Sequence, residues 1–210
     1  MGLVMKKLVF DDCLLGLWEI TEDFFFLYNR LNLTPEEIET LNSFKSYNRK
    51  LEWLSVRVLL TEMAGSGIKI FYNRKKKPFL TDRSYHISIS HSNKLTSILI
   101  SKNHNVGLDL EHVSNKIASL AGKFLTPGEL DAIDPSCRKY HVYIYWCAKE
   151  ALYKICDKQD INFREDIIIE PFVPGDGGVI NGKVHSDSIR EDFILNYFKY
   201  NDYAIVWCCK

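Results

Sequence analysis

Hydrophobic and polar residues alternate along the chain with the two periods that mark strands and helices. In the first half, apolar residues at helical spacing predict a helix over residues 51–63. Thr34, with Pro35 and Glu37 after it, predicts an earlier helix that begins with a capping box. Short apolar segments of strand character predict four strands, at residues 14–20, 86–91, 95–101 and 106–111.

The second half repeats this order of elements. Thr126, Pro127 and Glu129 predict another capped helix start, and a long helix is predicted over residues 140–156. A final hairpin is predicted from two strands, at residues 193–200 and 203–208.

One stretch, residues 171–185, has no counterpart in the first half. Its proline, glycine and asparagine content predicts an inserted loop or hairpin, with Asn181-Gly182 as a turn.

Three landmarks recur in the same order with separations of 91, 92 and 93 residues: Gly16-Leu17 with Gly107-Leu108, Thr34-Pro35 with Thr126-Pro127, and Trp53 with Trp146. Helix caps and strand starts recur in any chain that mixes helices and strands, but a tandem duplication explains the constant order and spacing. The fold class predicted is α+β, a pseudo-dimer of two similar α+β halves. The halves are residues 1–103 and 104–210. Two such halves would pack about a pseudo-twofold axis, and ligands favour clefts at such interfaces.

Composition narrows the class of protein. Lys plus Arg and Asp plus Glu both number 27, so the chain lacks the basic excess of a nucleic-acid binder. The hydrophobic content of 46% is that of a globular domain, and no apolar run approaches the length of a membrane span. Six cysteines without a CxxC spacing favour reduced thiols. We therefore expect a cytoplasmic protein that binds neither nucleic acid nor a membrane.

Two carboxylates stand two residues apart at the end of the strand 106–111. Asp109 and Glu111 share one face of that strand, while Leu108 and Leu110 face the core. Paired carboxylates on one face suit a hard cation such as Mg²⁺. The alternative is an acidic strand edge that faces solvent.

Charged residues also interrupt the predicted long helix. Glu150 and Lys154 are four residues apart and lie on one helix face. An ordinary surface pair is the alternative, but the neighbouring residues Tyr143, Trp146 and Ala151 are apolar.

Two further motifs have chemistry that suits phosphate. His91, between Ser90 and Ser92, ends a strand where side chains can reach a cleft, and residues 74–77 form a basic loop. A surface histidine and a solvated charge run are the alternatives for these two motifs.

Together these motifs resemble the surfactin-type (Sfp-like) 4′-phosphopantetheinyl transferases. That family combines a G-[IV]-D-x-E strand with a W-x-x-K-E-[AS]-x-x-K helix about forty residues later. The counterparts here are Gly107–Glu111 and Trp146–Lys154, with Asp109 and Glu150 separated by 41 residues. The family's S-H-S strand end and G-K-P loop correspond to residues 90–92 and 76–78, although Lys76 stands where the family usually has glycine. The resemblance covers about residues 44–169 and agrees with that family's pseudo-dimeric fold.

The resemblance implies an enzyme that transfers the 4′-phosphopantetheine arm of coenzyme A to a serine of an apo acyl or peptidyl carrier protein, releasing 3′,5′-ADP. Asp109, Glu111 and Glu150 would hold Mg²⁺, with Mn²⁺ as an alternative. Glu150 is then the candidate general base, and Lys154 would bind phosphate oxygens. Coenzyme A would be held by four residues of the first half: Arg49, Lys77, Ser90 and His91.

A carrier protein of this kind is acidic, and its docking surface should offer apolar anchors. Ile117, Leu120 and Phe124 recur at helical spacing and form a candidate docking stripe, with packing into the protein's own core as the alternative. With both halves in one chain, the protein is expected to act as a monomer. Two other functions stay open, namely another Mg²⁺-dependent phosphate enzyme of the phosphodiesterase kind and a non-catalytic module that binds coenzyme A or the carrier.

Overall fold

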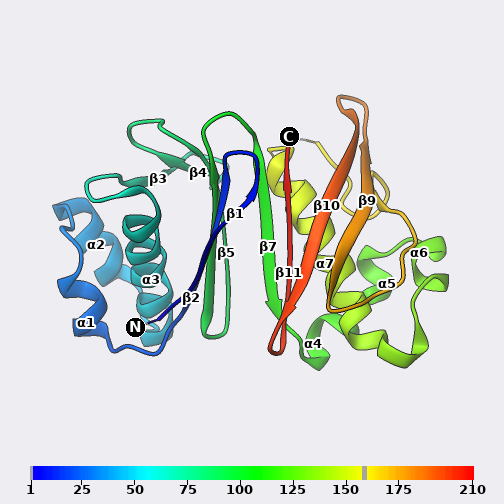
Figure 1. Ribbon diagram of the computed structural model, residues 1–210, viewed down its shortest axis with the longest axis horizontal. Helices are drawn as coiled ribbons and strands as arrows, with labels where there is room; N and C mark the ends of the chain where they lie inside the picture. Colours follow the sequence, from blue (N-terminus) through cyan, green and yellow to red (C-terminus); the bar gives the residue numbers. More distant parts are fainter. Residues whose placement is uncertain (1, 158–159) are drawn as a thin grey trace. The chain divides into compact units, whose positions relative to one another are not determined.

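The computed structural model describes residues 2–157 and 160–210, without the side chain of Asn115. The chain divides into two compact units, Met1–Asn103 (unit 1) and His104–Lys210 (unit 2). Each unit has its own antiparallel sheet and an 18-residue helix (Figure 1). The predicted α+β class with two similar halves is therefore confirmed.

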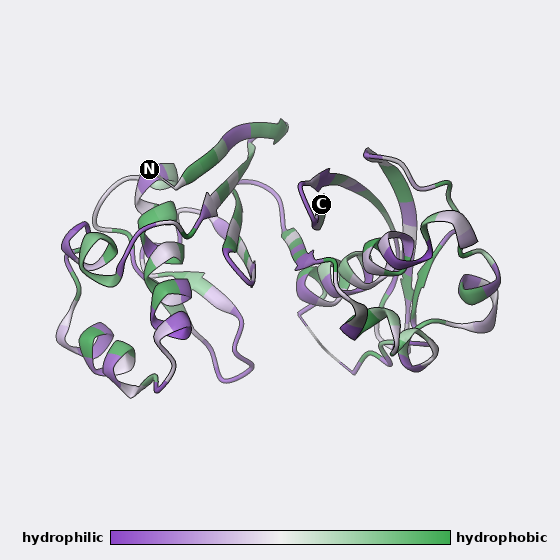
Figure 2. Ribbon diagram, turned by 90° about the horizontal axis from the view of Figure 1, so that it is seen from below, coloured by the Kyte–Doolittle hydropathy of each residue, from purple (hydrophilic) through white to green (hydrophobic). Residues whose placement is uncertain are grey.

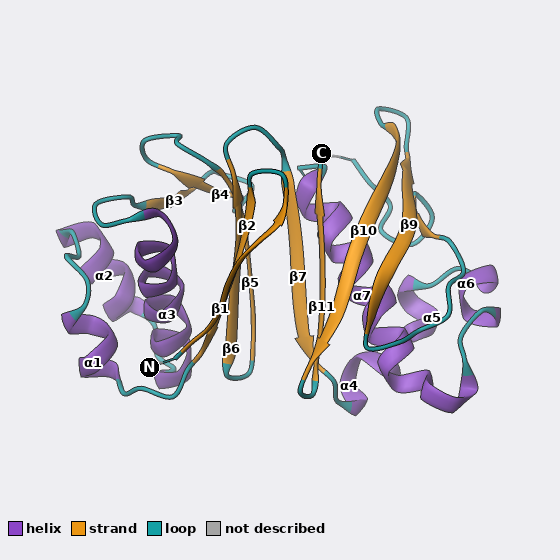
Figure 3. Ribbon diagram, viewed as in Figure 1, coloured by secondary structure: helices purple, strands orange, loops and turns teal. Residues whose placement is uncertain are grey.

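Unit 1 contains a four-stranded sheet in the order β1-β2-β6-β5 and a separate pair, β3 with β4. Its strands are β1 Leu3–Phe10, β2 Cys13–Glu19, β3 Ile70–Tyr72, β4 Pro78–Leu80, β5 His86–Ser92 and β6 Leu95–Ser101. Its helices are α1 Phe24–Asn29, α2 Pro35–Ser43 and α3 Tyr47–Ala64. Helix α3 packs on β2 and β6, and α1 and α2 lie beyond it (Figure 3).

Unit 2 contains a five-stranded sheet in the order β7-β11-β10-β9-β8. Its strands are β7 Val106–His112, β8 Ile167–Ile169, β9 Gly177–His185, β10 Arg190–Tyr200 and β11 Tyr203–Cys209. Its helices are α4 Asn115–Ala118, α5 Ala121–Phe124, α6 Pro127–Asp131, the 3-10 helix η1 Pro135–Cys137 and α7 Arg138–Ile155. Helix α7 packs on β7 and β11, as α3 packs on β2 and β6 in unit 1.

Local sequence signals explain the helix starts. Thr34 with Glu37, and Thr126 with Glu129, form the two predicted capping boxes, which satisfy amide groups that a helix start leaves without intrahelical partners. In Figure 2 the hydrophobic colour follows much of the strands and helices of each unit, where burial supplies the main stabilisation. Among the described residues, no helix combines the length and hydropathy needed to cross a membrane.

The turn predicted at Asn181-Gly182 is wrong. Both residues lie inside β9, where they pair with Ile194 and Phe193 of β10. A Cβ on Gly182 would lie 2.9 Å from the side chain of Leu152, so the glycine permits close packing rather than a turn. Cross-strand pairing therefore overrides the local turn propensity of this dipeptide. Strands β1, β3, β4 and β8 were also not predicted from the hydrophobic pattern.

Candidate functional site

Strand β7 approaches helix α7 unusually closely at Gly107. A Cβ on this glycine would lie 2.3 Å from the carbonyl oxygen of Ala151. No other residue fits without moving one backbone from the other. Because side chains alternate along a strand, Asp109 and Glu111 project from the same face as Gly107, toward α7.

Asp109 of β7 contacts Lys154 of α7 directly. We call this contact region between β7 and α7 the seam. The Lys154 ammonium donates to Oδ1 of Asp109 at 2.7 Å and to the carbonyl oxygen of Leu108 at 2.9 Å. The Asp109 side chain is only 7% exposed, against 22% for that of Lys154. This is a charge-assisted contact between the two predicted motifs, one on the strand and the other on the helix.

The pKa of Cys147 responds to the charges of this seam. Its thiol is fully buried, and burial raises its pKa well above the usual value. The negative charges of Asp109 and Glu111 raise the pKa further, while the positive charge of Lys154 lowers it. Both carboxylates and the lysine therefore act on the same buried thiol of α7.

Glu150 lies on this face of α7 as well. It is three residues after Cys147 and four before Lys154, spacings that place side chains over one another on a helix. Glu150 and Glu111 are both half-buried. Asp109, Glu111 and Glu150 thus offer only oxygen donors from two adjacent elements, a donor set that suits Mg²⁺ or Mn²⁺.

In unit 1, the structure brings together two of the residues predicted to bind coenzyme A. Arg49 of α3 donates through Nη1 to Nε2 of His91 of β5, at 2.7 Å. The same guanidinium contacts Glu52 at 3.1 Å, and Nδ1 of His91 lies 3.5 Å from that carboxylate. Glu52 was missed in the sequence, because a glutamate three residues after an arginine is typical of an exposed helix pair.

Ser90 does not join this cluster. His91 points toward α3, where it meets Arg49, so the adjacent Ser90 projects from the opposite face of β5. Ser90 is buried and stands across from Ser97 of β6.

Lys77 lies at the end of the turn that joins β3 to β4. Asn73 closes this turn by accepting hydrogen bonds through Oδ1 from the amides of Lys75 and Lys77, both at 2.9 Å. Lys76 has a φ of 61°, in the left-handed region that glycine adopts most readily. Lysine at this position therefore keeps the backbone conformation of a glycine, with some strain.

The comparisons with known proteins agree with this geometry. Residues 105–208 match the profile of the 4′-phosphopantetheinyl transferase superfamily. The similarity to this superfamily therefore lies in the second half of the chain. That half coincides with unit 2, which carries Asp109, Glu111, Glu150 and Lys154.

Two curated relatives match over 112 residues with 27% identity. Both are named 4′-phosphopantetheinyl transferase AcpT, one from Escherichia coli strain K12 and one from Escherichia coli O157:H7. Each match covers 50% of this chain, and the chain spans 57% of the length of these relatives.

The candidate docking stripe is not one exposed surface. Phe124 is 4% exposed in the core of unit 2, where its ring packs edge-on against Trp146 at 4.9 Å. Ile117 packs against the same core, whereas Leu120 is 39% exposed. The periodicity is helical because the core requires it, and the prediction of a continuous stripe for the carrier is wrong for Phe124.

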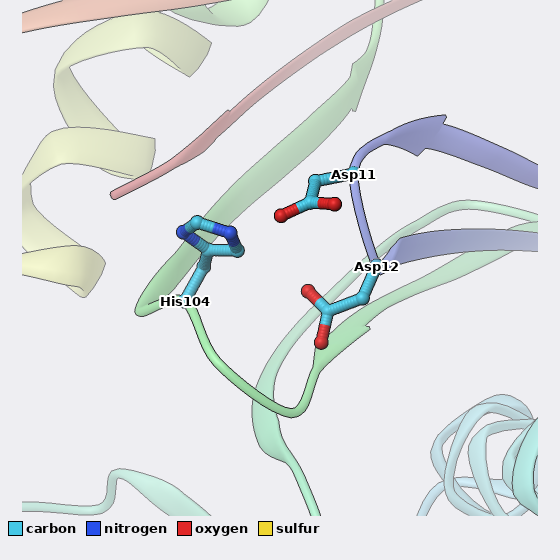
Figure 4. A group of neighbouring side chains, drawn as sticks. All are labelled: Asp11, Asp12 and His104. Carbon is cyan, nitrogen blue, oxygen red and sulfur yellow. The ribbon is translucent and has the colours of Figure 1, made fainter.

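Figure 4 draws a further group with metal-binding side chains, Asp11, Asp12 and His104. Asp11 and Asp12 form the turn between β1 and β2 of unit 1, and His104 is the first residue of unit 2. The Asp12 carboxylate accepts hydrogen bonds from the Ser101 hydroxyl at 2.5 Å and the Lys102 amide at 2.8 Å. These bonds close the turn after β6, and we assign no metal site to residues divided between the two units.

The first lysine of the helix motif was also missed as a structural residue. Lys149 is fully buried, and its ammonium lies 2.9 Å from Oε2 of Glu129, the capping-box glutamate of α6. Burial lowers the pKa of Lys149, and the negative charge of Glu129 opposes this shift. A signal was present in the sequence, since Lys149 lies one residue away from the helix face that Glu150 and Lys154 share.

Proposed function

We propose that this protein transfers the 4′-phosphopantetheine arm of coenzyme A to a serine of an apo acyl or peptidyl carrier protein. The observation that carries the proposal is the charged seam of unit 2, where Asp109 and Glu111 of β7 face Lys154 of α7. A seam of this kind combines oxygen donors for a cation with an ammonium for phosphate oxygens. The surfactin-type subfamily is the finer assignment, supported by the S-H-S strand end and the motif spacing.

Asp109, Glu111 and Glu150 are the proposed ligands of Mg²⁺ or Mn²⁺. An ion held by these carboxylates would neutralise charge at the pyrophosphate of coenzyme A. The Lys154 ammonium balances the charge of Asp109, which explains how a nearly buried carboxylate is kept in this seam.

The chain's own residues then act on the carrier serine and the leaving group. Glu150 takes the proton of the serine hydroxyl, whose oxygen forms a bond to the phosphorus that bears pantetheine. The bond from that phosphorus to the bridging pyrophosphate oxygen breaks, and its electron pair leaves with 3′,5′-ADP. Lys154 stabilises the charge on the departing phosphate.

Unit 1 supplies the proposed grip on the nucleotide phosphates. Arg49 and His91 meet at 2.7 Å; because Nε2 of His91 accepts from the guanidinium, the imidazole donates through Nδ1, and Arg49 keeps further N–H groups for a phosphate. Lys77, held by the Asn73 turn, is the third proposed contact. Ser90 is retained only as a candidate, because its side chain projects from the other face of β5.

The test is to incubate the protein with coenzyme A, Mg²⁺ and an apo carrier protein, and to weigh the carrier by mass spectrometry. The expected result is a carrier heavier by one phosphopantetheine, with equal amounts of 3′,5′-ADP released. A carrier variant whose acceptor serine is replaced by alanine is the matched control.

Other outcomes would contradict the proposal. Hydrolysis of coenzyme A at the same rate without a carrier would indicate a phosphodiesterase. Binding of coenzyme A without any turnover, in the presence of Mg²⁺ and several carriers, would indicate a non-catalytic module.

A further inference from the structure

Lys149 has no capacity left for a substrate. Its ammonium carries three N–H donors. They face the Glu129 carboxylate at 2.9 Å, the carbonyl oxygen of Ile167 at 2.5 Å and that of Arg164 at 3.2 Å. The side chain is fully buried, so Lys149 acts on other parts of the protein.

Glu129 anchors the other side of this pair. One carboxylate oxygen, Oε2, accepts from the amide and the hydroxyl of Thr126, at 2.8 and 3.0 Å. The other oxygen accepts from the amide of Ile169 in β8 at 2.9 Å. The pair therefore ties α7 to the start of α6, to β8 and to the segment before β8.

Unit 1 contains the matching pair. Glu37, of the other capping box, lies 3.1 Å from Nε of Arg57 on α3. The two pairs correspond by their contacts with the capping-box glutamates, and Arg57 and Glu37 both lie 92 residues before Lys149 and Glu129, although Trp53 and Trp146 of the same helices are 93 residues apart. A buried ion pair between the capping-box glutamate and the long helix thus recurs in both units. The residue that follows the cation on the long helix differs between them. It is the buried Val58 in unit 1 and Glu150 in unit 2.

We propose, on the basis of the proposed function, that Lys149 is a positioning residue for Glu150. Three bonds fix the rotation and the height of α7 at residue 149. The neighbouring Glu150 is thereby held on the face that carries Cys147 and Lys154, beside the carboxylates of β7. Lys149 itself contacts neither the metal nor the substrate.

The experiment compares Lys149→Met with Arg57→Met, the same change at the matching position of unit 1. Mn²⁺ binding is measured by the loss of the electron paramagnetic resonance signal of free Mn²⁺, and thermal unfolding is followed in parallel. We expect Lys149→Met to weaken Mn²⁺ binding about 10–100-fold per folded molecule, as is usual when a residue that orients a metal ligand is removed. Arg57→Met should leave the Mn²⁺ affinity within about two-fold of the wild type, because the residue next to Arg57 is Val58, which is not a carboxylate.

A second variant separates positioning from stability. In Glu129→Gln/Lys149→Met, glutamine can keep the capping box while no buried charge is left alone, so folding is retained better than in the single variant. We expect its Mn²⁺ affinity to stay as low as that of Lys149→Met. Recovery of wild-type affinity in this double variant would overturn the inference, and so would an equal loss in Arg57→Met.

The wild type distinguishes this inference from the function on which it rests. A wild-type protein that binds no Mn²⁺ would overturn the metal site, and this inference with it. A wild type that binds Mn²⁺ and transfers phosphopantetheine, together with a Lys149→Met variant of unchanged affinity, would overturn the inference alone.

Discussion

In unit 1, Gly16 of the strand that packs against the long helix is followed on the same face by Trp18, and Ile20 comes just after the strand ends. In unit 2, the matching strand continues from Gly107 to Asp109 and Glu111. Trp18 and Ile20 belong to the hydrophobic core with α3, whereas the Asp109 carboxylate pairs with Lys154 of α7. In both units a glycine lets the strand approach the long helix. The contact between strand and helix is then made by apolar side chains in unit 1 and by charged side chains in unit 2.

The difference teaches how the repeated fold divides its tasks. A seam filled by Trp18 gains stability from apolar burial. A seam that holds Asp109, Glu111 and Glu150 requires a cation or an ammonium to balance its carboxylates. Both units keep the parts that hold the strand against the helix: the Lys149–Glu129 pair and Gly107 in unit 2, and the Arg57–Glu37 pair and Gly16 in unit 1.

The largest effect is expected from the charged seam. Glu150→Gln should lower the turnover of carrier modification by about 10³-fold or more, because the change removes a side chain proposed both as a metal ligand and as the base. Steady-state kinetics at saturating Mg²⁺ measures the loss. Glu39→Gln, at an exposed glutamate of unit 1, is the control and should keep full turnover. Near-normal turnover of Glu150→Gln would refute the catalytic assignment.

The two strand glycines allow a direct test of the frame. A Cβ at Gly107 meets the backbone oxygen of Ala151 at 2.3 Å, while a Cβ at Gly16 meets the flexible side chain of Met63 at the same distance. Gly107→Ala should therefore lower the free energy of unfolding by about 3 kcal/mol, and Gly16→Ala by about 1 kcal/mol. Urea unfolding measures both changes, and equal losses would contradict the difference between the two seams.

The contribution of unit 1 to binding is tested at His91. Loss of a charge-assisted phosphate contact costs about 1.5–3 kcal/mol, so His91→Ala should weaken coenzyme A binding about 10–100-fold. Dephospho-coenzyme A, which lacks the 3′-phosphate, should be affected much less. His86→Ala, at the exposed start of the same strand, is the matched control for titration calorimetry. Equal losses for both ligands would exclude a contact with the 3′-phosphate.

Local signals in the sequence predicted the parts that local structure decides. Thr34 and Thr126 form capping boxes because the interacting residues are only three positions apart. The alternation of Leu108, Asp109 and Leu110 correctly placed the carboxylate on the opposite face of β7 from the leucines. The contact of Asp109 with Lys154 required the packing of strand on helix, which spacing along the chain does not contain.

The failures have the same origin in tertiary packing. Asn181-Gly182 is a dipeptide typical of turns, but Gly182 lies within β9, where the side chains of Ile169 and Leu152 leave no room for a Cβ. Phe124 has the periodicity expected of a docking stripe, but periodicity alone does not show what covers an apolar side chain. In the structure, Trp146 covers Phe124. Glu52 was overlooked because its contact with His91 joins residues 39 positions apart.

A smaller effect is expected from pH. His141 of α7 is fully buried, and burial lowers its pKa from 6.5, with Asp134 opposing the shift. The matching position of unit 1, eight residues before the paired cation, holds the permanently charged Arg49. The unfolded chain binds a proton at His141 below pH about 6.5 while the folded chain does not, so the free energy of unfolding should fall as the pH falls through this range. In His141→Phe, denaturant unfolding between pH 7 and 5 should show a weaker pH dependence than the wild type. An unchanged dependence would exclude this histidine as the cause.

The smallest effect is expected at Lys76, in the turn between β3 and β4, a strand pair without a counterpart among the described residues of unit 2. Lys76 has a φ of 61°, and a residue with a Cβ is strained in this left-handed conformation by about 1–2 kcal/mol. Glycine relieves that strain but loses more conformational entropy on folding, which offsets part of the gain. Lys76→Gly should therefore raise the free energy of unfolding by about 0.5–1 kcal/mol. The adjacent Lys75→Gly is the control, because Lys75 is outside the positive-φ region and the change should lower stability slightly.

Chemical denaturation of both variants, with binding of coenzyme A measured alongside, separates the strain of the turn from the proposed role of Lys77. If Lys76→Gly and Lys75→Gly change stability by the same amount, the left-handed conformation of Lys76 is not what limits this turn.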